Sequence, residues 1–156
     1  MTTLQRRRQR WRVAVLSAAV TCGSALAADG SDDTDAARNY LQYCSGCHRL
    51  DGSGSAANRV PTFAGSVGHF VRTGRGRAFL IQVGGVAQSA LTDAEIAALL
   101  NWLLPKYGGR EMPPDFSPYT VAEVHAKRGH RPADLMAART VIARELHDLG
   151  YSLTVY

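Results

Sequence analysis

Residues 40–48 of this chain of 156 residues read Tyr-Leu-Gln-Tyr-Cys-Ser-Gly-Cys-His. Tyr40, Leu41 and Cys44 lie three or four positions apart, so they share one face of a helix. We expect this helix to begin near Thr34 or Asp35. The stretch therefore places two thiols and an imidazole close together at the end of the first predicted helix.

The Cys-x-x-Cys-His pattern of Cys44, Cys47 and His48 predicts a covalently attached haem. Two thiols at this spacing can add to the two vinyl groups of one porphyrin, and the histidine that follows can bind the iron as its proximal ligand. A thioredoxin-like redox pair would require a βαβ pattern, and zinc would require two further ligands at a paired spacing. A simple disulfide would leave His48 without a role. We therefore predict one haem c, linked through Cys44 and Cys47.

The rest of the chain predicts helices joined by long loops, with neither an alternating strand pattern nor an internal repeat. Thr92 and Glu95 form a capping-box pattern before an apolar stripe, and Pro105 is expected to end that helix. Thr120 and Glu123 repeat the pattern before a helix over 121–128. A short buried helical piece is expected over 78–83, and a last helix is expected to begin near Pro132. The fold class is therefore all-α, and long loops of this kind usually pack around something, such as a haem.

Residues 35–128 resemble a monohaem class I c-type cytochrome. The resemblance rests on the motif at 40–48 and the Gly-rich loop after it, on Pro61-Thr62-Phe63, and on Leu91-Thr92-Asp93-Ala94-Glu95-Ile96. It implies a cytochrome c-like fold in which an N-terminal and a C-terminal helix cross beside the haem. The helix predicted from Pro132 is an extra C-terminal helix beyond this resemblance. It also implies His48 as the proximal iron ligand and a methionine as the distal one.

The distal ligand departs from the family pattern. Small bacterial members commonly carry Met-Pro at the place that corresponds to residues 84–90, and this segment holds no methionine. A second way of aligning the chain with the family treats the helix from Thr92 as the family's middle helix and the helix from Thr120 as its C-terminal helix. In this alignment, Met112-Pro113 lies in the loop that supplies the distal ligand. Met112 is the predicted distal ligand on this basis.

Two alternatives to Met112 remain open. His69 lies in a loop between Gly68 and Phe70, where its side chain could reach a metal, and an open or water-bound iron is the other possibility. Met136 lies inside the last amphipathic helix and is expected to belong to the core.

Residues 1–27 predict a cleaved secretory signal peptide. Five arginines without an acid, a short apolar run and the Ala25-Leu26-Ala27 ending match the three parts of such a signal. An uncleaved anchor helix is the alternative. The chain has 18 basic and 13 acidic residues, and those five arginines account for its net charge of +5. The mature chain gives no charge argument for nucleic-acid binding, and no run of 18 apolar residues predicts a membrane span.

These observations predict a periplasmic protein with a cytochrome c domain over 28–130 and a helical extension over 131–156. The expected function is single-electron transfer rather than enzymatic catalysis. The tail after Met112 also resembles small cytochromes associated with periplasmic amine or alcohol dehydrogenases. The expected partners are therefore such a dehydrogenase and an oxidase or another cytochrome. The alternative is a haem sensor or a peroxidase-like protein with an open or His69-ligated iron. Arg72, Arg75 and Arg77 form a basic cluster that fits a solvated loop, a docking patch or a contact to the haem propionates.

Overall fold

The computed structural model describes residues 30–153, and the predicted signal peptide lies outside this range. Within it the secondary structure is helical, without a named strand, and a single bridge joins Ser55 and Val60. The all-α prediction is confirmed. The elements are α1 (Gly30–Tyr43), α2 (Ser45–His48), α3 (Val67–Phe70), α4 (Gly74–Gln82), α5 (Gly84–Ala87), α6 (Asp93–Gly108), the 3₁₀ turn η1 (Gly109–Glu111), α7 (Val121–Arg128) and α8 (Leu135–Asp148).

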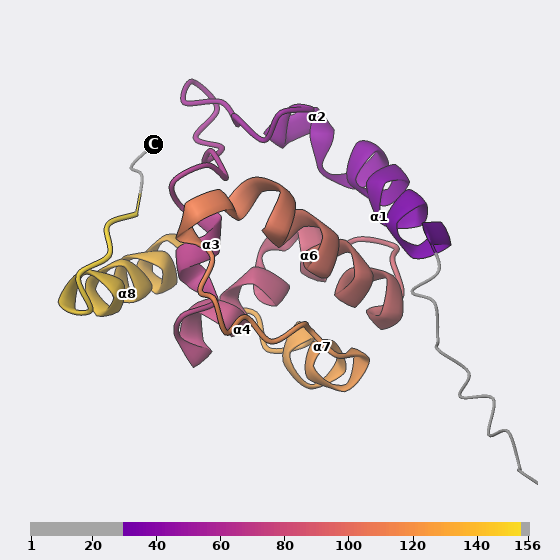
Figure 1. The fold of residues 1–156 in the computed structure, drawn as a ribbon. Coiled ribbons are helices and arrows are strands. Elements are labelled where there is room, and N and C mark those ends of the chain that lie inside the picture. Colours follow the sequence, from indigo (N-terminus) through magenta and orange to yellow (C-terminus); the bar gives the residue numbers. More distant parts are fainter. Residues whose placement is uncertain (1–29, 154–156) are drawn as a thin grey trace, which may run out of the picture.

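Helix α6 is the central element of the fold (Figure 1). It packs against α1 on one side and against α3 and α7 on others. Its buried residues lie on more than one face, because the sequence is apolar at adjacent as well as at periodic positions. They are Ile96, Ala97, Leu99, Leu100, Leu103, Leu104 and Gly108. A helix that is apolar around most of its circumference becomes the core of a small domain.

The packing of α6 against α1 settles which helix pairs with the N-terminal one. Tyr40 of α1 lies 5.6 Å from the ring of Trp102 and 5.4 Å from the ring of Tyr107, both on α6. Helix α7 buries only Val124. The second alignment, in which the helix from Thr120 is the C-terminal helix that pairs with α1, is therefore wrong, because α7 lacks the apolar surface that such a central contact needs.

The prediction that Pro105 ends α6 is also wrong. The helix continues for one more turn to Gly108, with Pro105 inside it. A proline near a helix end removes one hydrogen bond only, and Tyr107 compensates by packing on Tyr40 and Phe63 and by donating a hydrogen bond from its hydroxyl to the carbonyl oxygen of Leu50 at 2.9 Å.

The two capping patterns behave differently. At α6, Thr92 accepts a hydrogen bond from the backbone N–H of Glu95, and the Glu95 carboxylate accepts one from the backbone N–H of Thr92. At α7, Thr120 accepts from the N–H of Glu123, but the Glu123 carboxylate instead binds the guanidinium of Arg77 on α4 at 2.5 and 2.8 Å. The residues at the start of α7 thus serve both to cap it and to fasten it to α4.

Helix α8 begins at Leu135 rather than near Pro132. Asp134 caps it by accepting hydrogen bonds from the N–H groups of Met136 and Ala137. Its buried residues Ile142 and Leu146 form a second apolar cluster with Phe70 and Phe79 of α3 and α4. None of the described helices is long and apolar enough to cross a membrane.

Candidate functional site

The motif residues lie on one short stretch of backbone: Cys44 joins α1 to α2, and Cys47 and His48 are the last two residues of α2. The backbone N–H groups of Cys47 and His48 both donate to the carbonyl oxygen of Cys44, at 3.2 and 2.9 Å. Cys44 and Cys47 are free thiols, the first half-buried and the second exposed. Burial raises the pKa of the Cys44 thiol to about 11, with a further contribution from Cys47. The two sulfurs and the imidazole are thus presented by a single turn of backbone.

The imidazole of His48 has a defined orientation. Its Nδ1 lies 3.2 Å from the carbonyl oxygen of Pro61, and its ring stacks on Phe63 with centroids 4.2 Å apart. Burial lowers the pKa of His48 below its ordinary value, which favours the neutral ring. In the neutral ring an Nδ1–H that donates to Pro61 leaves the lone pair of Nε2 available to a metal. His48 is therefore held as a ligand would be.

Two cavities, of about 310 and 260 Å³, meet at His48. Both are lined mainly by apolar side chains. The larger one contains the two thiols and is closed by α6 through Leu99, Leu100 and Leu103. The smaller one reaches α8, and residues shared by both cavities are His48, Pro61, Phe63, Val67, Leu80 and Val83.

This donor set fits a covalently attached haem. The macrocycle has two broad apolar faces, which match the apolar walls of the cavities, and its vinyl groups need thiols on the same wall as the imidazole that binds the iron. Cys44, Cys47 and His48 all line the larger cavity.

Comparison with known proteins agrees with this geometry. The chain is 32% identical over 125 residues to cytochrome c-552 from Thermus thermophilus, an alignment that covers 67% of this chain and 94% of the relative. The chain belongs to the c-type cytochromes. A second cytochrome c-552, from a named strain of the same species, is also 32% identical, with 83% of that relative covered. No family model matches the cytochrome.

The cytochrome does not bring its predicted distal residues to the cavities. Met112 packs over the end of α6, where a Cβ added to Gly108 would lie 2.8 Å from its Sδ. The ring of His69 lies 5.2 Å from that of Tyr151, and its Nδ1 is buried without a hydrogen-bond partner among the described residues. Neither residue lines either cavity that His48 lines.

Three residues of α8 line the smaller cavity, Leu135, Met136 and Arg139, and sequence reasoning missed the last two. Arg139 is only 9% exposed. Met136 is 49% exposed, so its assignment to the core is wrong. A signal was present for Arg139, since it occupies the apolar stripe of α8 between Leu135 and Ile142. A charged residue on such a stripe indicates a polar requirement at that position.

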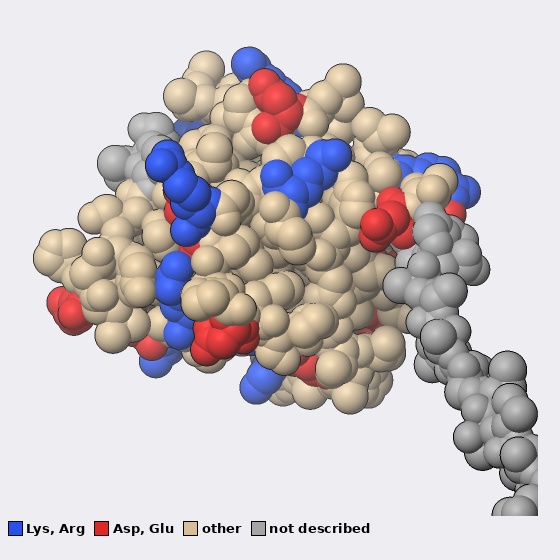
Figure 2. Space-filling model, in the orientation of Figure 1, with Lys and Arg blue, Asp and Glu red and all other residues tan. Residues whose placement is uncertain are grey.

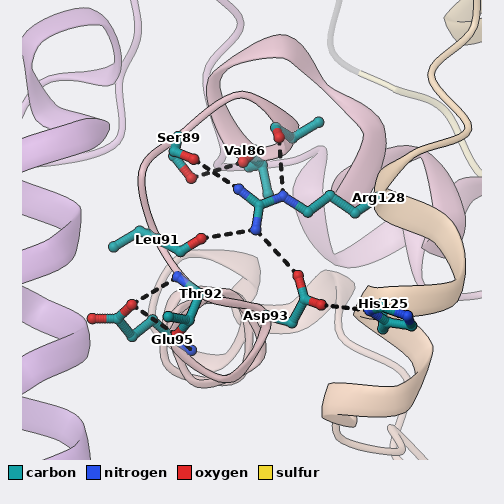
Figure 3. A network of polar contacts seen from close by, with 9 residues as sticks. Val86, Ser89, Leu91, Thr92, Asp93, Glu95, His125 and Arg128 are labelled. Atoms are coloured by element: carbon teal, nitrogen blue, oxygen red, sulfur yellow. Dashed lines mark hydrogen bonds and ion pairs between the residues drawn. The ribbon is translucent and has the colours of Figure 1, made fainter.

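The end of α5 and the loop that joins it to α6 are held in place from α7, beside residues that line the larger cavity. Val83, Gly85 and Val86 line the larger cavity. The guanidinium of Arg128 donates to the carbonyl oxygens of Ala87, Ser89 and Leu91 at 3.0, 2.7 and 2.8 Å, and to the carboxylate of Asp93 at 3.1 Å (Figure 3). The other carboxylate oxygen of Asp93, Oδ2, lies 2.9 Å from Nδ1 of His125. One side chain thus determines the path of the segment that leads into α6.

Of the basic cluster Arg72, Arg75 and Arg77, two arginines are held by contacts within the fold, whereas Arg75 is 64% exposed and lies 3.6 Å from Glu145. Arg77 binds Glu123 and the carbonyl oxygens of Ser117 and Pro118. Arg72 donates to the carbonyl oxygen of Glu111 at 2.8 Å and its guanidinium lies 4.1 Å from the ring centroid of Tyr151. These arginines join α4 and the segment after α3 to the C-terminal third of the cytochrome.

Proposed function

We propose that this cytochrome is a single-electron carrier with one haem c, attached through Cys44 and Cys47 and ligated on its proximal side by His48. The observation that carries the proposal is the arrangement of two free thiols and an imidazole, oriented by Pro61, on one apolar cavity. A haem bound there would supply a one-electron couple. The protein supplies the rest: the imidazole is held by Pro61 and Phe63, and apolar side chains from α6 exclude water.

The site also reaches the surface, as electron exchange requires. Cys47 is exposed, so the attachment end of the cavity lies close to solvent. Acidic and basic side chains are interspersed on the face shown in Figure 2, without an extended patch of one sign. Encounters between electron-transfer partners are usually small and brief. We propose a periplasmic dehydrogenase as donor and an oxidase or another cytochrome as acceptor.

The proposal of a periplasmic location rests on the N-terminal signal. Fractionation of cells that express the full chain, followed by N-terminal sequencing, tests it: the mature protein is expected in the periplasm, beginning at Ala28 or one residue later. An intact N-terminus in the membrane fraction would show an anchor instead.

The haem assignment is tested on protein produced with a cytochrome maturation system. The pyridine haemochrome spectrum and the intact mass should show one covalent haem per chain, and Cys44→Ala or Cys47→Ala should leave a single thioether link. A parent protein without covalent haem would refute the assignment. In stopped-flow experiments, a carrier is expected to be oxidised and reduced by one electron, with rate constants that stay unchanged over repeated cycles.

A haem sensor or peroxidase-like protein is the second candidate. It is favoured by the absence of methionine and histidine from residues 84–90 and by the position of Met112 and His69 outside the cavities. Binding of carbon monoxide to the ferrous protein at neutral pH separates the two functions. Ready binding indicates an open iron, and its absence indicates a six-coordinate carrier.

A further inference from the structure

We propose that Met136, on the C-terminal helix α8, supplies the distal iron ligand. This inference rests on the proposed function, since it requires a haem attached at Cys44 and Cys47 and bound by His48. It assigns the ligand to the C-terminal extension rather than to the segment before α6.

The lining of the 260 Å³ cavity carries the argument. It contains His48 on one element and Met136 on another, together with apolar side chains from α3 and α4. Imidazole and thioether are the two side-chain groups that ligate haem iron in electron carriers of this type. Among the residues that line this cavity, these are the two that have such groups.

The position of Met136 is fixed by the start of α8. The Asp134 carboxylate accepts a hydrogen bond from the N–H of Met136 at 2.8 Å, which makes Met136 a first-turn residue. Further along α8, Ile142 and Leu146 pack on Phe70 and Phe79. Because Phe70 and Phe79 also line the cavity, the same contacts that fasten α8 hold its first turn at the cavity.

The exposure of Met136 is consistent with this role. Met136 is 49% exposed at the cavity, while the buried apolar stripe of α8 is formed by Ile142 and Leu146. Methionine is unbranched and flexible, so its sulfur can adjust to a group that fills the cavity. Met112, by contrast, packs against Gly108 and the main core.

A ligand from α8 has a consequence for the redox potential. A thioether opposite an imidazole stabilises the ferrous state and raises the potential relative to water or a second imidazole. Loss of the ligand therefore lowers the potential, which a purely structural role of Met136 would not do.

The experiment compares Met136→Leu with Met112→Leu in the full chain, each matured with haem. Leucine preserves volume and apolar character, so both variants should keep the fold. The ferric parent should show the sulfur-to-iron charge-transfer band in the red. Met136→Leu should lose that band, lower the potential and bind carbon monoxide in the ferrous state, whereas Met112→Leu should change none of these.

A second variant guards against a general disturbance of the site. Met136→His should give the spectrum of an iron with two imidazole ligands, and that gain cannot arise from loosened packing. A charge-transfer band that is absent from the parent, or that survives in Met136→Leu, would refute the inference. Haem content by pyridine haemochrome separates the two proposals: a parent with covalent haem whose band follows Met112 overturns the role of Met136 alone, whereas a parent without covalent haem overturns both.

Discussion

Replacement of Arg128 by alanine tests the argument that α7 determines the path of the segment before α6. The side chain is 22% exposed and makes four hydrogen bonds, of which three end on main-chain carbonyl oxygens. Without it, the carbonyl groups of Ala87, Ser89 and Leu91 lose their contact with α7, while the residues of α5 that line the larger cavity keep their own packing. We therefore expect a loss of stability without a loss of haem.

The magnitude follows from the type of bond. A hydrogen bond from a charged donor contributes about 1.5–3 kcal/mol. The four bonds are lost together and water reaches the freed carbonyls, so their contributions are not additive. We expect the free energy of unfolding to fall by about 3 kcal/mol. With a urea m value of about 1–3 kcal/mol/M, the unfolding midpoint should fall by roughly 1–3 M.

Urea titration of the haem-loaded protein, followed by circular dichroism in the far ultraviolet, measures this change. His125→Ala is the matched control, because His125 is on the same helix and also binds Asp93, but is 81% exposed. An exposed ion pair contributes little, so its midpoint should match that of the parent. Equal midpoints for Arg128→Ala and the parent would refute the reasoning.

Three further predictions concern other parts of the fold. Gly54 has φ +68°, and a Cβ there would lie 2.5 Å from the carbonyl oxygen of Pro61. Gly54→Ala should therefore lower the free energy of unfolding, measured by thermal unfolding, by about 2–4 kcal/mol. It should also change the haem spectrum, because it displaces the Pro61 carbonyl oxygen that accepts the hydrogen bond of His48. Ile96→Ala removes a fully buried side chain of α6 and should cost about 2–5 kcal/mol in urea titration; a loss no larger than that of an exposed site would contradict the central place of α6. Hydrogen bonds from His125 and Arg128 lower the pKa of Asp93 below its ordinary value of 3.8. The contribution of the Asp93 carboxylate to stability is therefore complete above pH 3.8 and is lost as the pH falls through the lowered pKa. In acid titrations below pH 3.8, the stability difference between the parent and Asp93→Asn should shrink, and a difference that stays constant with pH would contradict this.

Local signals in the sequence predicted the elements that local interactions determine. The capping residues Thr92 and Thr120 predicted the starts of α6 and α7, because a side chain that accepts an N–H three residues on acts within one turn. The Cys-x-x-Cys-His motif predicted a thiol and imidazole cluster for the same reason, and the structure places Cys44, Cys47 and His48 on one cavity.

Signals that depend on distant parts of the chain were misread. Nothing near Pro105 shows that Tyr107 packs on Tyr40 and holds the last turn of α6. The choice between α6 and α7 as the partner of α1 depends on how much apolar surface each helix buries. An alignment of sequence motifs with the family pattern does not show this buried surface. Met136 lies one position from the apolar stripe of α8, so the period of the helix alone could not show that it lines a cavity.

The hydrogen bonds of Arg128 to the segment before α6 end on main-chain oxygens, which every type of amino acid possesses. The shape of this segment is therefore encoded in α7, some 37 to 41 residues away in sequence, and is largely independent of the side chains within the segment. Substitutions at positions such as 87 and 89 can accumulate while the backbone keeps its path. A loop of this kind can exchange one chemical group for another during evolution without a change in the architecture around it.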